Sequence, residues 1–166
     1  MDYKIDKMIS SDWKQVSKIY LEGINTGKAT FQTEVPTYEE WDNGHVKPCR
    51  VVARLGNDVL GWGALSTTSS RCVYQGVAEV SIYIGKNHRG KRIGKNLLKS
   101  LIELSEENGF WTLQSVIIIE NISSIKLHEK CGFREIGRRE KVAKMKNGDW
   151  HDAVFMERRS TIIGID

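Results

Sequence analysis

The 166-residue sequence is poor in the features that mark fibrous, disordered or membrane proteins. Glycine and proline account for only 17 of the 166 residues and the apolar fraction is 40%, which excludes collagen-like and low-complexity chains. No apolar run approaches the roughly 18 residues that a membrane helix needs. Charged residues occupy the start, where a secretory signal has its apolar stretch, so we expect a cytoplasmic protein with no membrane partner.

Cysteine is also scarce. The three cysteines, Cys49, Cys72 and Cys131, are widely spaced and form no C-x-x-C pair. An odd, dispersed set fits neither a disulfide framework nor a cysteine-rich zinc site. His45 and His88 lack a partner pattern and no metal-ligand spacing appears, so we expect no metal.

Acidic residues are missing from one segment, although the net charge of +4 is modest. Residues 86–99 contain no Asp or Glu and six basic residues: Lys86, Arg89, Lys91, Arg92, Lys95 and Lys99. Such a stretch could serve a nucleic-acid-binding domain, but it lacks the interleaved aromatic residues that stack on bases. We therefore expect no nucleic-acid partner.

The length fits one domain with one core, because domains usually contain ~100–200 residues. We assign residues 1–160 to this domain and residues 161–166 to a C-terminal tail, since no repeat, linker or composition break divides the chain. The tail is either disordered or in contact with a second subunit.

The first half of the chain predicts a strand, two helices and a hairpin. Apolar residues recur at helical spacing after the capping residues 10–12, and Gly56-Asn57-Asp58 is typical of a hairpin turn. The expected strands are 3–8, 50–55 and 58–68, with a helix over 13–24 and a short one over 38–46.

The second half predicts alternating strands and helices. Residues 77–84 alternate as a half-buried strand, with Glu79, Ser81 and Tyr83 on one face. An amphipathic helix from 93 ends at Asn108-Gly109, and the run 116–119 predicts a central strand buried on both faces. A helix over 121–130 and strands over 133–146 and 150–159 follow. The result is an α/β fold: a mixed, mostly antiparallel sheet of about seven strands, about four helices, and one parallel crossover from 77–84 to 116–119.

The sharpest motif is H-R-G-K-R-I-G-K at 88–95, where a strand turns into a helix. Free backbone N–H groups and the positive helix end favour a phosphate there, and the basic side chains add charge. A solvated helix face behind a glycine turn is the alternative. The segment fails as a P-loop because Arg92 replaces the Ser or Thr that ligates magnesium, and no G-x-G-x-x-G follows the first strand.

This turn resembles the signature R/Q-x-x-G-x-G/A of the GNAT superfamily of acyl-CoA-dependent N-acetyltransferases. Arg89, Ile93 and Gly94 match, Gly90 is common in these enzymes, and Arg92 stands where the middle glycine usually lies. A right-handed helical backbone at residue 92 would accommodate arginine at little cost.

Further segments narrow the resemblance to the branch of phosphinothricin acetyltransferases. They are A-T-F-Q-T-E at 29–34, R-C-V-Y at 71–74, A-E-V-S-I-Y-I at 78–84, N-I-S-S-I-K-L-H-E-K-C-G-F at 121–133 and W-H-D at 150–152. Members of this branch acetylate the α-amino group of small amino-acid-like compounds such as phosphinothricin, methionine sulfoximine and methionine sulfone. The resemblance implies an acetyl-CoA-dependent N-acetyltransferase that works by direct attack in a ternary complex, and a homodimer.

The resemblance also implies where acetyl-CoA binds. The pantetheine arm would lie between the parted ends of two strands, with a backbone N–H at a strand bulge facing the thioester oxygen. The diphosphate would lie on the amides from Gly90 to Lys95. The implied cofactor-binding residues are Ile82, Tyr83, Ile84, Arg89, Gly90, Lys91, Arg92, Ile93, Gly94, Lys95, Asn121 and Ser124.

Two residues are implied as catalytic. His128 stands where many GNAT enzymes have a tyrosine that protonates the thiolate, and Glu79 would receive the amine proton. The alternatives are a packing histidine and an ordinary strand carboxylate. These two residues also argue against a second reading, a CoA-binding module that has lost its chemistry.

Four residues are implied as substrate-binding. Phe31 and Glu34 lie in the loop after the first helix, while Arg71 and Tyr74 resemble a pair that contacts the substrate carboxylate. For W-H-D at 150–152, a structural role and a substrate role remain open.

Overall fold

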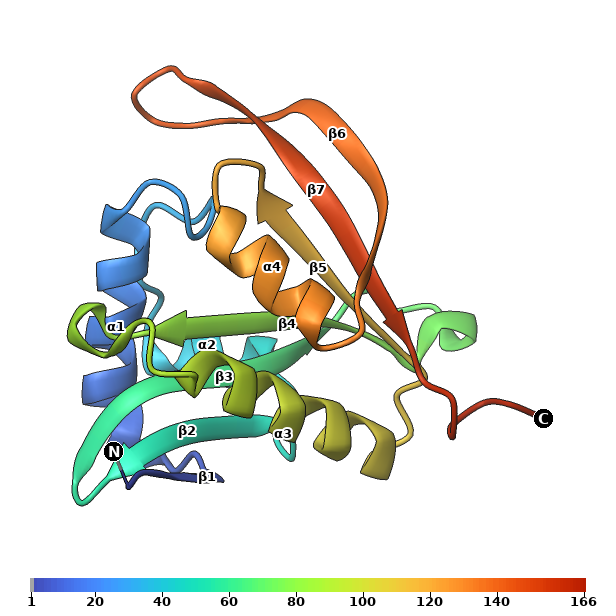
Figure 1. Cartoon of the computed structure of the whole chain (residues 1–166), viewed down its shortest axis with the longest axis horizontal. Helices are drawn as coiled ribbons and strands as arrows, with labels where there is room; N and C mark the ends of the chain where they lie inside the picture. Colours follow the sequence, from blue (N-terminus) through green and yellow to red (C-terminus); the bar gives the residue numbers. More distant parts are fainter. Residues whose placement is uncertain (1) are drawn as a thin grey trace.

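The computed structural model describes residues 2–166 and contains a seven-stranded sheet in the order β1-β2-β3-β4-β5-β7-β6 (Figure 1). All neighbouring strands are antiparallel except β4 and β5, which are parallel and joined by a helical crossover. The predicted fold class is therefore confirmed. The strands are β1 (Lys4–Lys7), β2 (Arg50–Leu55), β3 (Asp58–Thr67), β4 (Val77–Ile84), β5 (Thr112–Ile118), β6 (Arg134–Lys144) and β7 (Trp150–Arg159).

Four α-helices cover the sheet on two sides. The helices α3 (Ile93–Glu107) and α4 (Ile122–Lys130) pack on one face, and α1 (Trp13–Asn25) and α2 (Tyr38–Gly44) pack on the other. Short 3₁₀ turns, η1 (Ser10–Asp12), η2 (Cys72–Tyr74) and η3 (Lys86–His88), precede α1, β4 and α3. Within residues 2–166, no helix has the length and apolarity to cross a membrane.

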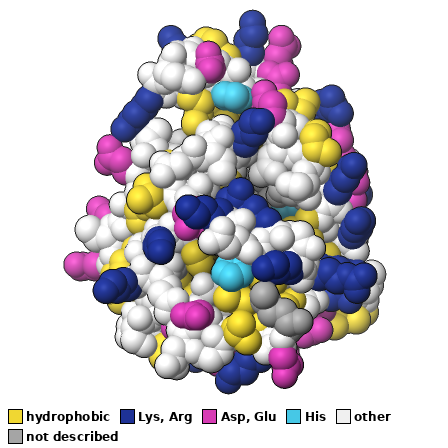
Figure 2. Space-filling view, turned by 60° about the vertical axis from the view of Figure 1, so that its left-hand side comes forward, with side chains coloured by type: hydrophobic (Ala, Val, Ile, Leu, Met, Phe, Trp, Pro, Cys, Tyr) yellow, Lys and Arg dark blue, Asp and Glu magenta, His cyan; other side chains and the backbone are white. Residues whose placement is uncertain are grey.

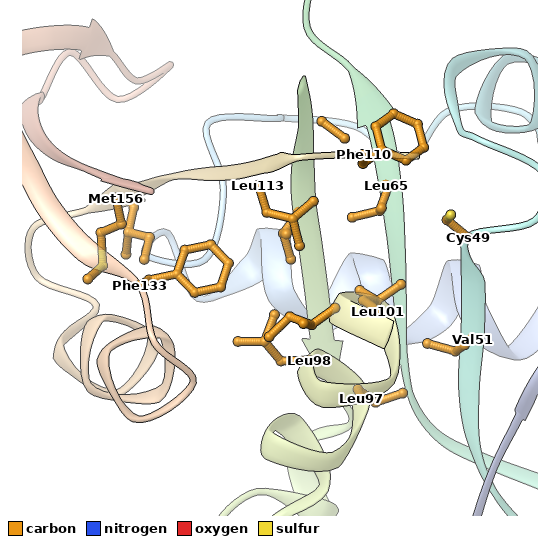
Figure 3. Close-up of a cluster of buried hydrophobic side chains, with 14 of the residues drawn as sticks. Cys49, Val51, Leu65, Leu97, Leu98, Leu101, Phe110, Leu113, Phe133 and Met156 are labelled. Carbon is orange, nitrogen blue, oxygen red and sulfur yellow. The ribbon is translucent and has the colours of Figure 1, made fainter. Parts of the chain in front are cut away.

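The larger core lies between α3 and the sheet (Figure 3). Leu97, Leu98 and Leu101 are fully buried there. Burying each such side chain stabilises the folded state by about 1.5–3 kcal/mol relative to leaving it exposed. A Cβ atom at Gly63 would lie 2.9 Å from Cδ1 of Leu101, so glycine in β3 lets α3 approach closely. This packing holds α3 on the sheet and thereby positions its N-terminal end.

Aromatic residues form the second core, beneath α1. The rings of Trp62 and Tyr83 stack with centroids 4.8 Å apart, and Tyr20 packs on both. The glycine of α1 at residue 23 leaves room for Tyr83, whose ring lies 2.7 Å from where a Cβ would be. Tyr83 is thus buried, so α1 covers the carboxyl end of a strand that was predicted to be half-buried.

The parallel strands β4 and β5 part at their carboxyl ends (Figure 1). Their pairing runs from Val77 opposite Thr112 to Glu79 opposite Gln114 and goes no further in the described chain. Beyond this point β4 stays paired with β3 up to Ile84, and β5 with β7. The register of β3 and β4 shows no bulge along these described strands, so the predicted strand bulge is wrong: the gap arises because β5 turns away.

The strand β5 differs from its predicted form. It begins at Thr112 rather than at 116, and residues Leu113, Ser115 and Ile117 are buried on the α3 side. On the opposite face Gln114 and Val116 are only half-buried, whereas Ile118 is buried, so the predicted burial on both faces holds only at the carboxyl end of the strand. The reason is that α1 packs on β3 and β4 but leaves β5 less covered.

The C-terminal tail folds back on the start of β5. The Arg159 guanidinium donates hydrogen bonds to the carbonyl oxygens of Trp111 and Ile163, at 3.2 and 2.8 Å. Ile162 and Ile165 in this tail are exposed.

Candidate active site

The turn between β4 and α3 has the backbone form of an anion-binding loop. Gly90 and Arg92 both have positive φ, +76° and +63°. Arg92 does not adopt the right-handed conformation that would accommodate it at little cost: the residue before α3 is left-handed, the conformation that the usual glycine adopts without strain. Since the first amides of a helix have no intrahelical partner, those of Ile93, Gly94 and Lys95 can donate to an anion.

Basic side chains surround this turn. Lys91 Nζ donates to the Asn87 carbonyl at 2.9 Å, and Arg89 Nε to the Ile84 carbonyl at 3.4 Å. Both side chains are exposed, as is that of Arg92. Lys and Arg side chains gather beside a hollow in the surface in Figure 2. Backbone amides and positive charge thus meet at one place, suited to a phosphate group.

Directly after β5, Asn121 caps α4. Its Oδ1 accepts hydrogen bonds from the Ser124 amide at 3.3 Å and the Ser123 hydroxyl at 3.1 Å. The cap places Asn121 and Ser124 at the carboxyl end of β5, where the gap from β4 opens.

His128 lies one helical turn beyond Ser124 and is 3% exposed. Its Nδ1 donates to the Ser124 carbonyl at 2.8 Å, and its ring meets the Phe133 ring edge-on at 5.0 Å. Nε2 is buried and has no hydrogen-bond partner among residues 2–166. Burial lowers the pKa of His128, only partly opposed by the bond to Ser124. The ring is therefore neutral near pH 7, and its Nε2 carries a lone pair.

Glu79 occupies the last position at which β4 and β5 pair. Its Oε2 accepts a hydrogen bond from Gln114 Nε2 at 3.4 Å, across the two strands. The side chain is half-buried and shares a face of β4 with Ser81 and Tyr83, on the α1 side of the sheet. A carboxylate thus stands where the gap begins.

The four predicted substrate residues lie in two separate places. Arg71 and Tyr74 are exposed before β4, with the guanidinium 5.7 Å from the centre of the tyrosine ring. Glu34 lies in the loop after α1 and pairs with Lys146 of the β6–β7 hairpin at 3.0 Å, and Phe31 is half-buried in the same loop. Figure 1 shows η2 and this loop at opposite ends of β4. One chain therefore does not bring the two pairs together.

The W-H-D segment has a structural role in part. Asp152 Oδ1 accepts a hydrogen bond from the Lys141 amide at 2.7 Å, at a bulge in β6 where φ of Lys141 is +44°. The neighbouring His151 contacts Glu120 through Nδ1 at 3.2 Å. Sequence reasoning missed Glu120 and Lys146; the signal for them was the hairpin at Asn147-Gly148, which brings this segment back over the end of β5.

No group of three His, Cys, Asp or Glu side chains in the described chain is arranged to hold a metal ion. The site thus combines an anion-binding turn, a gap between strands, a buried neutral histidine and a carboxylate. These parts suit transfer of an acyl group from a phosphate-bearing carrier.

Comparison with known families decides the class. The family model described as "Acetyltransferase (GNAT) family" matches residues 13–133. The chain belongs to this family. The predictions of an N-acetyltransferase and of its phosphinothricin acetyltransferase-like branch are confirmed by this match and by the relatives that follow.

Two curated relatives are similar over most of their length. A candidate phosphinothricin acetyltransferase of Bacillus subtilis is 34% identical over 89% of this GNAT chain and 93% of its own. The L-methionine sulfoximine/L-methionine sulfone acetyltransferase of Pseudomonas paraeruginosa is 32% identical over 89% of this chain and 88% of its own.

Among solved structures, a GNAT superfamily phosphinothricin acetyltransferase from Sinorhizobium meliloti in complex with acetyl-CoA has a similar fold. Its TM-score is 0.88 at 30% identity, and the match covers 100% of this chain and 92% of that one.

Proposed function

We propose that this acetyltransferase transfers the acetyl group of acetyl-CoA to the α-amino group of a small amino acid or analogue, of the phosphinothricin, methionine sulfoximine or methionine sulfone type. The observation that carries the proposal is the parting of β4 and β5 beside the turn at 89–95. A pantetheine arm can occupy such a gap while the diphosphate binds the turn. The acetyl-CoA complex of the S. meliloti relative and the names of the curated relatives support it.

In this proposal the cofactor is bound mainly by backbone groups. Ile82, Tyr83 and Ile84 offer amides and carbonyls to the pantetheine, Asn121 and Ser124 flank it from the other strand, and the turn from Arg89 to Lys95 binds the diphosphate. The support is that these segments border one gap.

The proposed chemistry is direct attack. Glu79 accepts a proton from the acceptor ammonium, and the free amine attacks the thioester carbonyl. His128 is neutral, so it first takes a proton at Nε2 from the nitrogen of the tetrahedral intermediate and then gives it to the departing thiolate. This refines the predicted role of general acid, because a group with a lowered pKa is not protonated at the start.

Arg71 and Tyr74 are proposed to bind the acceptor carboxylate, and Phe31 and Glu34 to border the acceptor. Because one chain separates the two pairs, both can serve one site only if a loop moves or a second chain contributes. A homodimer and a cytoplasmic location remain predictions.

The test is a thiol-release assay with acetyl-CoA and a panel of acceptors. The panel contains L-amino acids, methionine sulfone, methionine sulfoximine, phosphinothricin, polyamines and peptides. We expect turnover with the sulfone, the sulfoximine or phosphinothricin. Turnover confined to polyamines or peptides would reject the proposed acceptor class, and binding of acetyl-CoA without turnover on any acceptor would favour a non-catalytic CoA-binding module.

A further inference from the structure

A small cavity lies between the loop after α1 and the hairpin that joins β6 to β7. Its volume is about 220 Å³, and its walls include Ile24, Gln32, Thr33, Lys146 and His151. Such a space equals roughly seven water molecules at ~30 Å³ each, which suits the side chain of an amino acid. The ion pair of Glu34 and Lys146, 3.0 Å long, links the two walls.

The cavity is next to the gap between β4 and β5. Ile24 packs in the same aromatic cluster as Tyr83, near the end of β4. Glu120, the partner of His151, follows β5 and directly precedes Asn121. A molecule in this cavity therefore lies at the carboxyl ends of both parted strands.

His151 is held firmly in this wall. The Asp152 carbonyl accepts a hydrogen bond from the Ile119 amide at 3.1 Å, and Asp152 Oδ1 accepts one from the Lys141 amide, so the residue that follows His151 is held through both its backbone and its side chain. Nδ1 lies 3.2 Å from Glu120 Oε1. A carboxylate can only accept, so the proton is on Nδ1 and, in the neutral ring, Nε2 carries a lone pair.

The free nitrogen of His151 is available to a ligand. Nε2 makes no hydrogen bond among residues 2–166, yet it is not sealed from solvent as Nε2 of His128 is. Two charged side chains neighbour the ring: Glu120, its ion-pair partner, and Lys146, which lines the same cavity and pairs with Glu34, and both reach solvent. In the neutral ring the lone pair of Nε2 accepts a hydrogen bond, so the group that it recognises is a hydrogen-bond donor.

We propose that this cavity receives the side chain of the acceptor and that His151, oriented by Glu120, selects side chains that offer an N–H. The inference rests on the proposed function and names a specificity residue for it. The N–H of a sulfoximine can donate to Nε2. The sulfone has the same size but offers only oxygen atoms. These cannot donate a hydrogen bond to the lone pair of Nε2, which is then left without a partner.

The experiment compares methionine sulfoximine with methionine sulfone, which differ by one N–H. We expect the unmodified chain to prefer the sulfoximine in kcat/KM by about tenfold, the factor that a hydrogen bond of about 1.4 kcal/mol is worth. His151→Phe removes the preference. His151→Gln keeps part of it, because the amide oxygen also accepts a hydrogen bond at the distance of Nε2. Glu120→Ala lowers it, since the ring loses its fixed orientation.

The control is Trp150→Ala in the same hairpin. Trp150 is exposed, contacts Lys144 and does not line the cavity, so this variant keeps the preference. Equal kcat/KM for the two compounds in the unmodified chain, or equal losses for both in His151→Phe, would overturn the proposal.

Calorimetric titration separates this proposal from the proposed function. Each compound is titrated into the chain saturated with CoA, which needs no turnover. If no amino acid is acetylated but the sulfoximine binds about tenfold more tightly than the sulfone, and His151→Phe equalises them, the cavity assignment stands while the activity fails. Equal binding of the two compounds rejects the assignment in either case.

Discussion

The two sides of the gap between β4 and β5 offer different groups to a ligand. On the α3 side, the turn at 89–95 presents backbone amides whose position follows from the helix start and from two left-handed residues, Gly90 and Arg92. On the opposite side, the wall of the cavity proposed for the acceptor, called the acceptor wall below, consists of side chains from the loop after α1 and from the β6–β7 hairpin. The first side suits one invariant group, a diphosphate, and the second side can vary with the acceptor.

This difference predicts that changes on the two sides separate kinetically. Variants of the turn at 89–95 should change the affinity for acetyl-CoA, whereas variants of the acceptor wall should change KM for the acceptor. Variants of the two proposed proton-transfer residues, Glu79 and His128, should change kcat.

His128, on α4, is the proposed proton-transfer group for the thiolate. Replacing it with Phe should lower kcat by ~10²–10⁴-fold, the usual contribution of a positioned proton-transfer group, with little change in acetyl-CoA affinity. Because burial lowers the pKa of His128, the neutral form persists below pH 6.5, and turnover that depends on it should decline only at more acidic pH. Steady-state kinetics from pH 5 to 9 test both points; an unchanged kcat in His128→Phe rejects the assignment.

Glu79 is expected to have an effect that depends on pH. Glu79→Gln removes the proton acceptor but keeps the hydrogen-bonding shape beside Gln114. The loss of turnover should reach ~10²-fold at low pH, where the acceptor amine is fully protonated, and shrink as pH rises. A loss of equal size at every pH would make Glu79 a positioning or structural residue.

Two variants that add negative charge test the turn at 89–95. In Gly94→Asp the new carboxylate lies in the first turn of α3, where it repels a diphosphate; its Cβ lies 3.1 Å from Leu127 Cδ2, so the leucine side chain must shift slightly. We expect the Kd for acetyl-CoA to rise by ~10–100-fold, and Arg89→Glu to act in the same direction. The matched control is Glu34→Gln on the acceptor side, which should leave this Kd unchanged in calorimetry. Unchanged affinity in both folded turn variants would place the cofactor elsewhere.

Arg71 tests the acceptor carboxylate. Arg71→Met should raise KM for amino acids by ~10-fold or more, the value of a charge-assisted pair, and leave KM for acetyl-CoA unchanged. Esterifying the acceptor carboxylate should cause a comparable loss that does not add to that of the mutation. Equal activity of the unmodified chain on amino acids and simple alkylamines would show that no such contact exists.

Most of the fold was predictable because local patterns report local geometry. The alternation at 77–84, the apolar spacing from Ile93 and the turn at Gly56-Asn57 each predicted an element that the structure contains. The errors concern tertiary contacts. Burial of Tyr83 depends on Gly23 in a distant helix, and the half-open face of β5 depends on where α1 packs. Neither is encoded in the strand itself.

In the candidate site, too, local features were predictable and contacts between distant segments were not. The turn at 88–95 was predictable because its residues are contiguous. The separation of Arg71 and Tyr74 from Phe31 and Glu34 was not, since it depends on which end of β4 each loop reaches. The contact of His151 with Glu120 joins residues 31 positions apart through the pairing of β7 with β5. The hairpin at Asn147-Gly148 indicates that the chain turns back, but the sequence does not specify which residue His151 then contacts.

The smallest predicted effect concerns Arg92. The left-handed conformation costs a residue other than glycine about 1–2 kcal/mol, and a glycine would relieve this strain. Glycine also makes the unfolded chain more flexible, which offsets about 0.4–1 kcal/mol of the stabilisation. Arg92→Gly should therefore raise the free energy of unfolding by roughly 0.5–1 kcal/mol, measured as a higher urea midpoint at equal slope.

Two controls isolate the backbone at this turn. Arg92→Ala removes the charge but keeps the strained backbone, so it should raise the free energy of unfolding by less than Arg92→Gly does. Gly90→Ala tests the opposite change: φ is +76° and a Cβ there meets no atom within 4 Å, so any loss of stability comes from backbone strain alone. If Arg92→Gly destabilises as much as Arg92→Ala, the arginine side chain stabilises the turn. The positive φ would then be maintained by side-chain contacts, and the α3 side would depend on side chains as the acceptor side does.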